Sequence, residues 1–415
     1  MKNLNGTAQP ARCPVALALA LFSVFPLNAA AQSQWGLAPA TTVNATQINF
    51  AGHEWVVIGN EHKDIYTNDG AYGGGLTQPS GSVTLLLKSD GTANLEAGGG
   101  FGGVLPFRDN GNTCAGSYAG TCNTDPTEYN DSTLQNRMEE IANALPGKEL
   151  GVINTRDLAP ITGAYASNLA DLNENDGING AVVADQKLWA LSYPEWEAVN
   201  DKGVRSYPSS WWLRSPDNIF DHLALAGRSG GDYYYYYFVD YPAFVVRPAF
   251  NLNLNPVLFT AESSRVAGAG KSAVTAGGGY QSAAQPTTGA MKFTFLDPGI
   301  ATPTLTLKST PLAFDFVGAP TGVNRYVSGF LYNSTSNAGF YAKYADTSSS
   351  STGSFNAAGT FADGSYTLHI FSEEANGDLY SDFASPSVEF TFDVVSGSVQ
   401  NLTLTTTGAA RSIAD

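Results

Sequence analysis

The second half of the chain contains a series of short runs in which apolar and polar residues alternate. A period of two is typical of strands that bury one face, because successive side chains of a strand point to opposite sides of the sheet. Turn sequences such as Asp363-Gly364 and Asn376-Gly377 separate the runs. Short strands at this spacing predict an all-β immunoglobulin-like sandwich over residues 291–396. The runs are Lys292–Leu296, Thr304–Leu307, Ala313–Val317, Tyr326–Tyr332, Tyr366–Phe371 and Val388–Phe392.

The segments beside the predicted sandwich have a different composition. Residues 262–290 are rich in Ala, Gly and Ser and predict a linker, while residues 397–415 are polar and predict a flexible tail. Earlier in the chain, Ser132 and Gln135 have the spacing of a capping box, and Pro146 ends the pattern that follows. This pattern predicts one helix. Its apolar residues recur at helical intervals and are Leu134, Met138, Ile141 and Leu145.

The first residues have the features of a secretory signal peptide. Lys2 and Arg12 precede an apolar stretch over Val15–Leu27, and small residues up to Ala31 fit a signal-peptidase site. We therefore expect removal of residues 1–31 and an exported mature protein that is periplasmic, secreted or at the cell surface. The later chain has no apolar run of about 20 residues, so no membrane span is expected.

Charge argues against nucleic acid as a partner. The chain has 21 Lys and Arg residues against 37 Asp and Glu residues, which gives a formal net charge of −16. Phosphate contacts require clustered basic residues, and no basic stripe occurs along the mature sequence. The partner expected for this exported chain is therefore a cell-surface protein or glycan.

Two short segments bear on cross-links and metals. Cys114 and Cys122 remain after signal removal, and in an oxidising compartment they predict a local disulfide rather than a reactive thiol pair. The loop 171–180 has oxygen ligands at alternate positions, but Asp176 and Val182 stand where an EF-hand has Gly and Glu. An ordinary turn is therefore favoured over bound calcium in this loop. No other metal or cofactor is expected.

Two motifs in the middle of the chain carry a resemblance to a known family. One is Trp211-Trp-Leu-Arg-Ser-Pro216, and the other is Val245-Val-Arg-Pro-Ala-Phe250. They resemble a family of exported bacterial domains of unassigned function, which is similar to the formylglycine-generating-enzyme branch of C-type-lectin folds. The resemblance covers residues 48–261 and implies an α+β C-type-lectin-like recognition domain over residues 32–261. It also implies a buried framework, which comprises Trp211, Trp212, Arg214, Arg247 and Phe250.

The segment between the two motifs is the candidate ligand-binding face. Its five tyrosines, Tyr233–Tyr237, would place phenol rings on both sides of a strand. Tyr together with Ser, Gly, Asn and Asp is typical of paratopes, because a rigid ring supplies contact area at low entropic cost. Some of these rings are expected to pack on the framework, and the others to face a ligand. The candidate residues are Asp217, Asn218, Phe220, Asp221, His222, Arg228, Asp232, Tyr233, Tyr234, Tyr235, Tyr236, Tyr237, Asp240 and Tyr241.

The same region lacks certain residue types. From Ser215 to Ala261 there is no Lys, Glu, Gln, Trp or Met, although each occurs elsewhere in the chain. These residues cannot be encoded when an adenine-adenine-cytosine codon is randomised at its adenines, as diversity-generating retroelements do in C-type-lectin-like proteins. Chance absence from a Tyr-rich hairpin is the alternative explanation.

These features together predict a function in binding rather than catalysis. The protein is expected to be an exported, non-catalytic ligand-binding protein, active in adhesion or surface recognition. One alternative is a formylglycine-generating-type or carbohydrate-active enzyme, but the mature cysteines lie outside the matching motifs, and the four His residues are scattered. A second alternative is a structural surface or fimbrial subunit that uses the sandwich for assembly.

Overall fold

The chain is mostly β-structure. In a computed structural model, the described residues are 35, 42–60, 81–88, 105–107, 129–158, 182–216, 223–231, 234–239, 244–262, 277, 280–282 and 290–406. Within them, strands account for 51% and helices for 11%, in four helices. The expected α+β C-type-lectin-like fold is therefore wrong. The motifs that suggested it do form local strands, but a short motif does not determine how distant strands assemble into sheets.

One 15-stranded sheet contains most of the strands. Its main path comprises β1 (Gln47–Phe50), β2 (His53–Gly59), β3 (Ser82–Leu87), β4 (Ile153–Asn154), β11 (Pro248–Asn253), β13 (Gln281–Ser282), β14 (Ala290–Leu296), β17 (Arg325–Asn333), β18 (Ala338–Asp346), β20 (Gly364–Glu374) and β21 (Asp382–Ala384). Their order across the sheet is β13-β18-β17-β20-β21-β14-β1-β2-β3-β11-β4. Further strands pair with this path, namely β7 (Trp189–Ala190), β12 (Val257–Glu262), β22 (Val388–Val395) and β23 (Ser398–Thr406). A separate pair is formed by β5 (Arg156–Leu158) and β6 (Val183–Gln186).

The C-terminal part of the chain is consistent with the expected β-sandwich. A small sheet of β15 (Thr304–Leu307), β16 (Ala313–Val317) and β19 (Gly353–Asn356) packs against the strands of the large sheet. Phe314 of β16 and Phe390 of β22 meet across the two sheets, with ring centroids 5.0 Å apart. The core between the sheets is apolar and also includes Leu331 and Leu368.

Residues Ser398–Thr406 differ from the predicted flexible tail, because they form β23. This strand pairs in antiparallel fashion with β22 and places Val399, Leu402 and Leu404 against the sandwich core. Leu402 and Leu404 alternate with threonines, which is a strand pattern. The many polar residues around them obscured that pattern in the sequence.

Strand β14 joins the two halves of the chain. It pairs in parallel with β1 and β21 and in antiparallel fashion with β12. Side-chain contacts reinforce this junction, since Asn49 Nδ2 donates to the carbonyl of Asp378 at 2.9 Å. β12, which ends at Glu262, and β14, which begins at Ala290, therefore pair in one sheet, while most of the expected linker 262–290 lies outside the described residues.

The predicted helix is confirmed as α1 (Thr133–Ala144). Ser132 accepts from the backbone N–H of Gln135, whose side chain in turn accepts from the N–H of Asp131. The short helix α2 (Gly147–Gly151) follows directly and carries buried Glu149, whose Oε1 accepts from the N–H groups of Ala51 and Ser381. The remaining described helices are α4 (Tyr193–Ala198) and α5 (Lys202–Arg205).

Three predicted features fall outside the described residues. They are the signal peptide at 1–31, the cysteines Cys114 and Cys122, and the loop 171–180. Among the helices that the structure describes, none has the length and apolar composition needed to cross a membrane.

Candidate functional site

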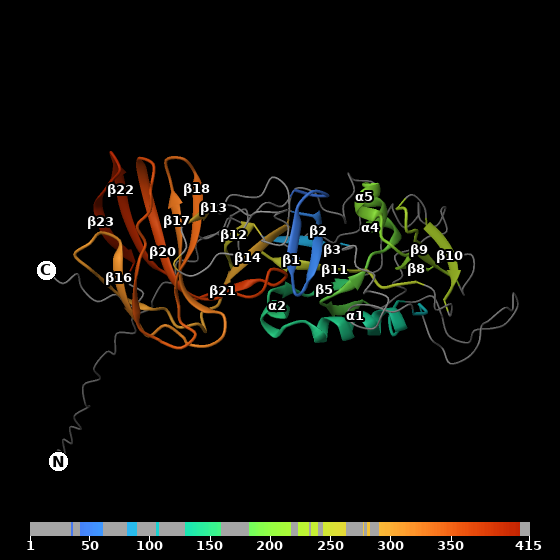
Figure 1. The fold of residues 1–415 in the computed structure, drawn as a ribbon. Coiled ribbons are helices and arrows are strands. Elements are labelled where there is room, and N and C mark those ends of the chain that lie inside the picture. The colour runs from blue at the N-terminus through green and yellow to red at the C-terminus, as the bar shows by residue number, and fades with distance from the viewer. Residues whose placement is uncertain are drawn as a thin grey trace, which may run out of the picture.

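A small three-stranded sheet carries part of the candidate ligand-binding face. Its strands are β8 (Trp211–Pro216), β9 (Leu223–Gly227) and β10 (Tyr234–Phe238), in the order β10-β9-β8. Both strand pairs are antiparallel. Figure 1 shows this sheet at the end of the molecule opposite the sandwich.

The base of this sheet is a rigid aromatic framework. Trp211 and Trp212 are fully buried, and both pair with β9, Trp211 opposite Gly227. A Cβ at Gly227 would lie 3.0 Å from the Trp211 ring and 3.3 Å from Trp196 Nε1, so a larger residue here would have to displace these rings by a few tenths of an ångström. The indole N–H of Trp212 donates to the carbonyl of Leu105 at 2.7 Å.

Two tyrosines of β10 pack on buried rings beside this framework. Tyr234 meets Tyr193 edge-on, with ring centroids 4.7 Å apart, and Tyr237 meets Phe244 in the same way at 4.6 Å. Both remain half-buried, and the neighbouring Phe238 is 36% exposed. Aromatic side chains of β10 are therefore held by the core and still reach the surface.

The structure brings together only some of the predicted face residues. Arg228 is exposed and follows Gly227, which pairs with Tyr234. Tyr235 and Tyr236 lie in β10, opposite Ala226 and Leu225. The other predicted face residues lie outside the described part of the chain; they are Asp217, Asn218, Phe220, Asp221, His222, Asp232, Tyr233, Asp240 and Tyr241.

A buried ion triad fixes helix α4 beneath β8. Arg214 contacts Glu195 through two hydrogen bonds of 2.5 and 3.0 Å, and Arg156 Nη2 lies 2.8 Å from Glu195 Oε1. Glu195 also completes a capping box with Ser192. Burial by itself raises the pKa of Glu195, but the charges of Arg214 and Arg156 lower it to about 2. The carboxylate is therefore charged at neutral pH. Sequence reasoning did not single out Glu195, although the Ser192-x-x-Glu195 spacing would have placed it at a helix start.

Arg247 has a structural role of a different kind. Its guanidinium donates to the carbonyls of Leu87, Arg205 and Val204, at 2.8, 3.1 and 2.7 Å. It also lies over the rings of Tyr207 and Trp211. Burial lowers the pKa of Arg247 to about 9. With Arg214, Trp211, Trp212 and Phe250, it belongs to the interior, as a framework residue should.

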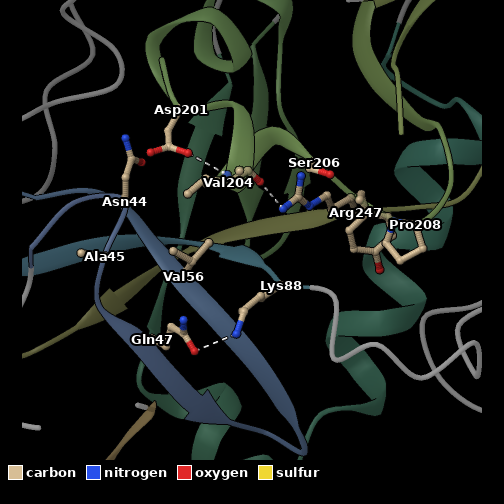
Figure 2. A pocket seen from close by; sticks show the side chains of 12 residues that line it. Asn44, Ala45, Gln47, Val56, Lys88, Asp201, Val204, Ser206, Pro208 and Arg247 are labelled. Carbon is tan, nitrogen blue, oxygen red and sulfur yellow. Dashed lines mark hydrogen bonds between the residues drawn. The ribbon is translucent and has the colours of Figure 1, made fainter. Parts of the chain in front are cut away.

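A cleft of about 510 Å³ lies beside Arg247 and was not anticipated from the sequence. Figure 2 shows that its polar groups contact one another. Lys88 Nζ donates to Gln47 Oε1 at 2.7 Å, and Asp201 Oδ1 accepts from the N–H of Val204 at 3.0 Å. Within the described residues, no group of three or more His, Cys, Asp or Glu side chains has an arrangement that could hold a metal ion. The cleft walls thus contain hydrogen-bonded polar groups around an apolar Val56.

Comparisons with protein-family models, with curated proteins and with solved structures found no match for this chain.

Proposed function

We propose that this protein is an exported, non-catalytic binding protein that recognises a cell-surface protein or glycan. The binding surface would centre on β10. We call this region the β10 surface and define it, among the described residues, by Arg228, Tyr234, Tyr237 and Phe238. The observation that carries the proposal is that Tyr234 and Tyr237 are half-exposed while each packs against a buried ring, Tyr193 and Phe244 respectively.

Physical reasons support recognition at such a surface. An aromatic ring that is already held by its neighbours loses little conformational entropy when a ligand binds. Tyr and Arg are also the side chains most often found to dominate binding energy at interfaces. The β10 surface offers both types, and it lies at the end of the molecule distant from the sandwich (Figure 1). The sandwich would then serve to space or present the binding end.

The experiment starts from a screen of the full mature protein against a glycan array and a panel of purified surface proteins. The best hit is then tested with a variant in which Tyr234, Tyr237 and Phe238 are all changed to Ala. We expect a loss of about 2 kcal/mol or more in binding free energy, as for central anchors. Tyr380→Ala is the matched control, because Tyr380 is 40% exposed and lies outside the β10 surface.

Folding must be separated from binding in this test. A second variant, Tyr234→Phe with Tyr237→Phe, keeps both rings in place and removes only the phenol hydroxyls. Circular dichroism and melting temperature establish that each variant is folded. A folded triple-Ala variant with the affinity of the unmodified protein would contradict the proposal.

We also propose that the segment between the two motifs is varied by a diversity-generating retroelement. The support is the absence of five residue types between Ser215 and Ala261. The test is to sequence the DNA around the gene and codons 215–250 in a population descended from one cell. A nearby template copy, a reverse transcriptase gene and changes confined to template adenines are expected. An invariant segment without a template copy would indicate one fixed ligand instead.

A further inference from the structure

Three ionisable side chains lie on neighbouring strands at the junction between the two halves of the chain. They are Lys292 of β14, Asp382 of β21 and Glu373 of β20. Asp382 pairs with Thr294, two positions beyond Lys292, and Glu373 pairs with Ala384, two positions beyond Asp382. Residues two apart on a strand share a face, so these three side chains lie on one face of the sheet.

The lysine and the aspartate are in direct contact. Lys292 Nζ lies 2.7 Å from Asp382 Oδ1, and the two side chains are only 11% and 10% exposed. The backbone of Asn376 orients both groups, because its carbonyl accepts from Lys292 Nζ at 2.6 Å and its N–H donates to Asp382 Oδ1 at 2.6 Å. This contact places the nitrogen directly beside the carboxyl group that it would attack.

Among the described residues, only one of the two carboxyl oxygens of Glu373 accepts hydrogen bonds. Glu373 is fully buried, and its Oε2 accepts from Ser328 Oγ at 2.5 Å and from the Tyr341 hydroxyl at 2.6 Å. Its Oε1 has no hydrogen-bond partner among the described residues. A buried carboxylate oxygen of this kind is available to accept and return a proton.

The surroundings are apolar and aromatic. Tyr341 and Ala384 belong to a buried cluster that also contains Trp35, Phe259, Phe330 and Phe371. Water is excluded from such a cluster, and separated charges are costly there. Burial raises the pKa of Asp382 to about 7, with the charge of Glu373 adding to the rise and Lys292 and Lys343 opposing it. Transfer of a proton from Lys292 Nζ to the Asp382 carboxylate across the 2.7 Å contact would leave an uncharged amine beside a carboxylic acid.

We propose that Lys292 and Asp382 condense into an intramolecular amide bond, with Glu373 as the proton-transfer group. Lys292 Nζ, as the neutral amine, attacks Cγ of the protonated Asp382 carboxyl, and the N–C bond forms. Glu373 takes one proton from the nitrogen and delivers a proton to the Asp382 hydroxyl, whose C–O bond then breaks. The products are one amide and one water. Glu373 is regenerated unchanged, and nothing is oxidised or reduced.

A second lysine–aspartate pair shows why contact alone is insufficient. Lys308 Nζ and Asp315 Oδ1 also lie 2.7 Å apart, but their side chains are 39% and 53% exposed. Water reaches both groups of this pair and screens their contact, so the apolar surroundings of the buried pair are missing here. The bond is therefore expected at the buried pair and not at the exposed pair. The exposed pair serves as a matched control within the same chain.

The test is the mass of the full exported chain under denaturing conditions, with its N-terminus determined. We expect a mass lower than that of the sequence by one water, about 18 Da. Trypsin should fail to cleave after Lys292, and a branched peptide should join residues 272–308 to residues 344–411. A full sequence mass would overturn the proposal. Loss of water at another place, such as a succinimide at Asp363-Gly364, would overturn it equally.

Variants assign the roles of the three residues. Lys292→Arg and Asp382→Ala should each restore the full mass, and Lys308→Arg should leave the mass deficit unchanged. The Glu373→Gln side chain can still accept hydrogen bonds from Ser328 and Tyr341, but it is a poor base. The Glu373→Gln protein should therefore have the full mass of the sequence. Circular dichroism should show that it is folded. Bond formation in Glu373→Gln to the extent seen in the unmodified protein would overturn the role given to Glu373.

Discussion

Glu195 is the single residue that compensates two buried cations, Arg156 and Arg214. The three side chains are between 3% and 7% exposed. Removal of one partner from a buried ion pair typically costs about 3 to 5 kcal/mol, because it leaves a charge in the interior without compensation. We expect Glu195→Ala to lower the free energy of unfolding by about this amount, as measured by urea denaturation. The control is Glu140→Ala, which breaks an exposed pair with Arg137 and should cost less than about 1 kcal/mol. Equal effects of the two changes would contradict the structure.

The same residue gives the protein a defined response to acid. The pKa of Glu195 is lowered in the folded state from 4.5 to about 2, so the folded state binds its proton less tightly than the unfolded state does. Its stabilising contribution is therefore fully present above a pH of about 4.5 and is lost as the pH falls toward about 2. The difference in unfolding free energy between the unmodified protein and Glu195→Gln should shrink between pH of about 5 and about 3. A difference that stays constant over this range would show that Glu195 does not titrate in this way.

Among the secondary-structure elements, β23 gives the clearest test of the sandwich. It covers one side of β22 and adds Val399, Leu402 and Leu404 to the core. A chain that ends after Gly397 should lose these contacts and expose the edge of β22, so its melting temperature should fall by several degrees. A chain that ends after Thr406 removes only the residues beyond β23 and serves as the control. Identical melting temperatures for the two truncated chains would mean that β23 adds nothing to stability.

Local sequence patterns predicted where helices and strands lie better than they predicted which strands pair with one another. The cap at Ser132 and the helical spacing of Leu134, Met138 and Ile141 were sufficient to place α1, because these signals act within a few residues. Alternation likewise identified β14, since its apolar residues can be read directly. Its pairing with β1 could not be read, because Gln47 and Ala290 lie far apart in the sequence and alternation does not specify a partner.

In the candidate site too, the sequence identified residues that belong to short motifs but not a residue whose role depends on partners far away in the chain. The sequence marked Trp211, Trp212, Arg214 and Arg247 as framework residues, and the structure places all four in the interior. It did not single out Glu195 of α4, whose importance depends on two arginines brought to it by strands β5 and β8. The expected C-type-lectin-like fold failed for a related reason, because the motifs behind it describe local strands and not their assembly.

At the scale of the whole molecule, the continuous sheet predicts cooperative unfolding. β14 links β1 of the N-terminal half to β21 of the C-terminal half, and buried Glu149 bonds to Ala51 and Ser381 on the two sides of this junction. We expect one calorimetric transition for the mature protein, with equal calorimetric and van't Hoff enthalpies. Two transitions, one matched by a chain of residues 291–406 alone, would instead show that the halves are independent domains.

The proposed amide bond adds a prediction about the stability of the protein and so about the temperature of that single transition. Lys292 and Asp382 are 90 positions apart, since 382 − 292 = 90, and a cross-link over such a span removes much of the conformational entropy of the unfolded chain. Lys292→Arg keeps a cation beside Asp382 and prevents the bond. It should therefore lower the free energy of unfolding by about 4 to 5 kcal/mol, as estimated for a closed loop of this length. Lys308→Arg, at the exposed pair, should change it by less than about 0.5 kcal/mol. Because β1, β14 and β21 belong to one sheet, the loss should shift the whole transition to lower temperature and leave it single. A Lys292→Arg protein as stable as the unmodified one would mean that no covalent link holds β14 to β21.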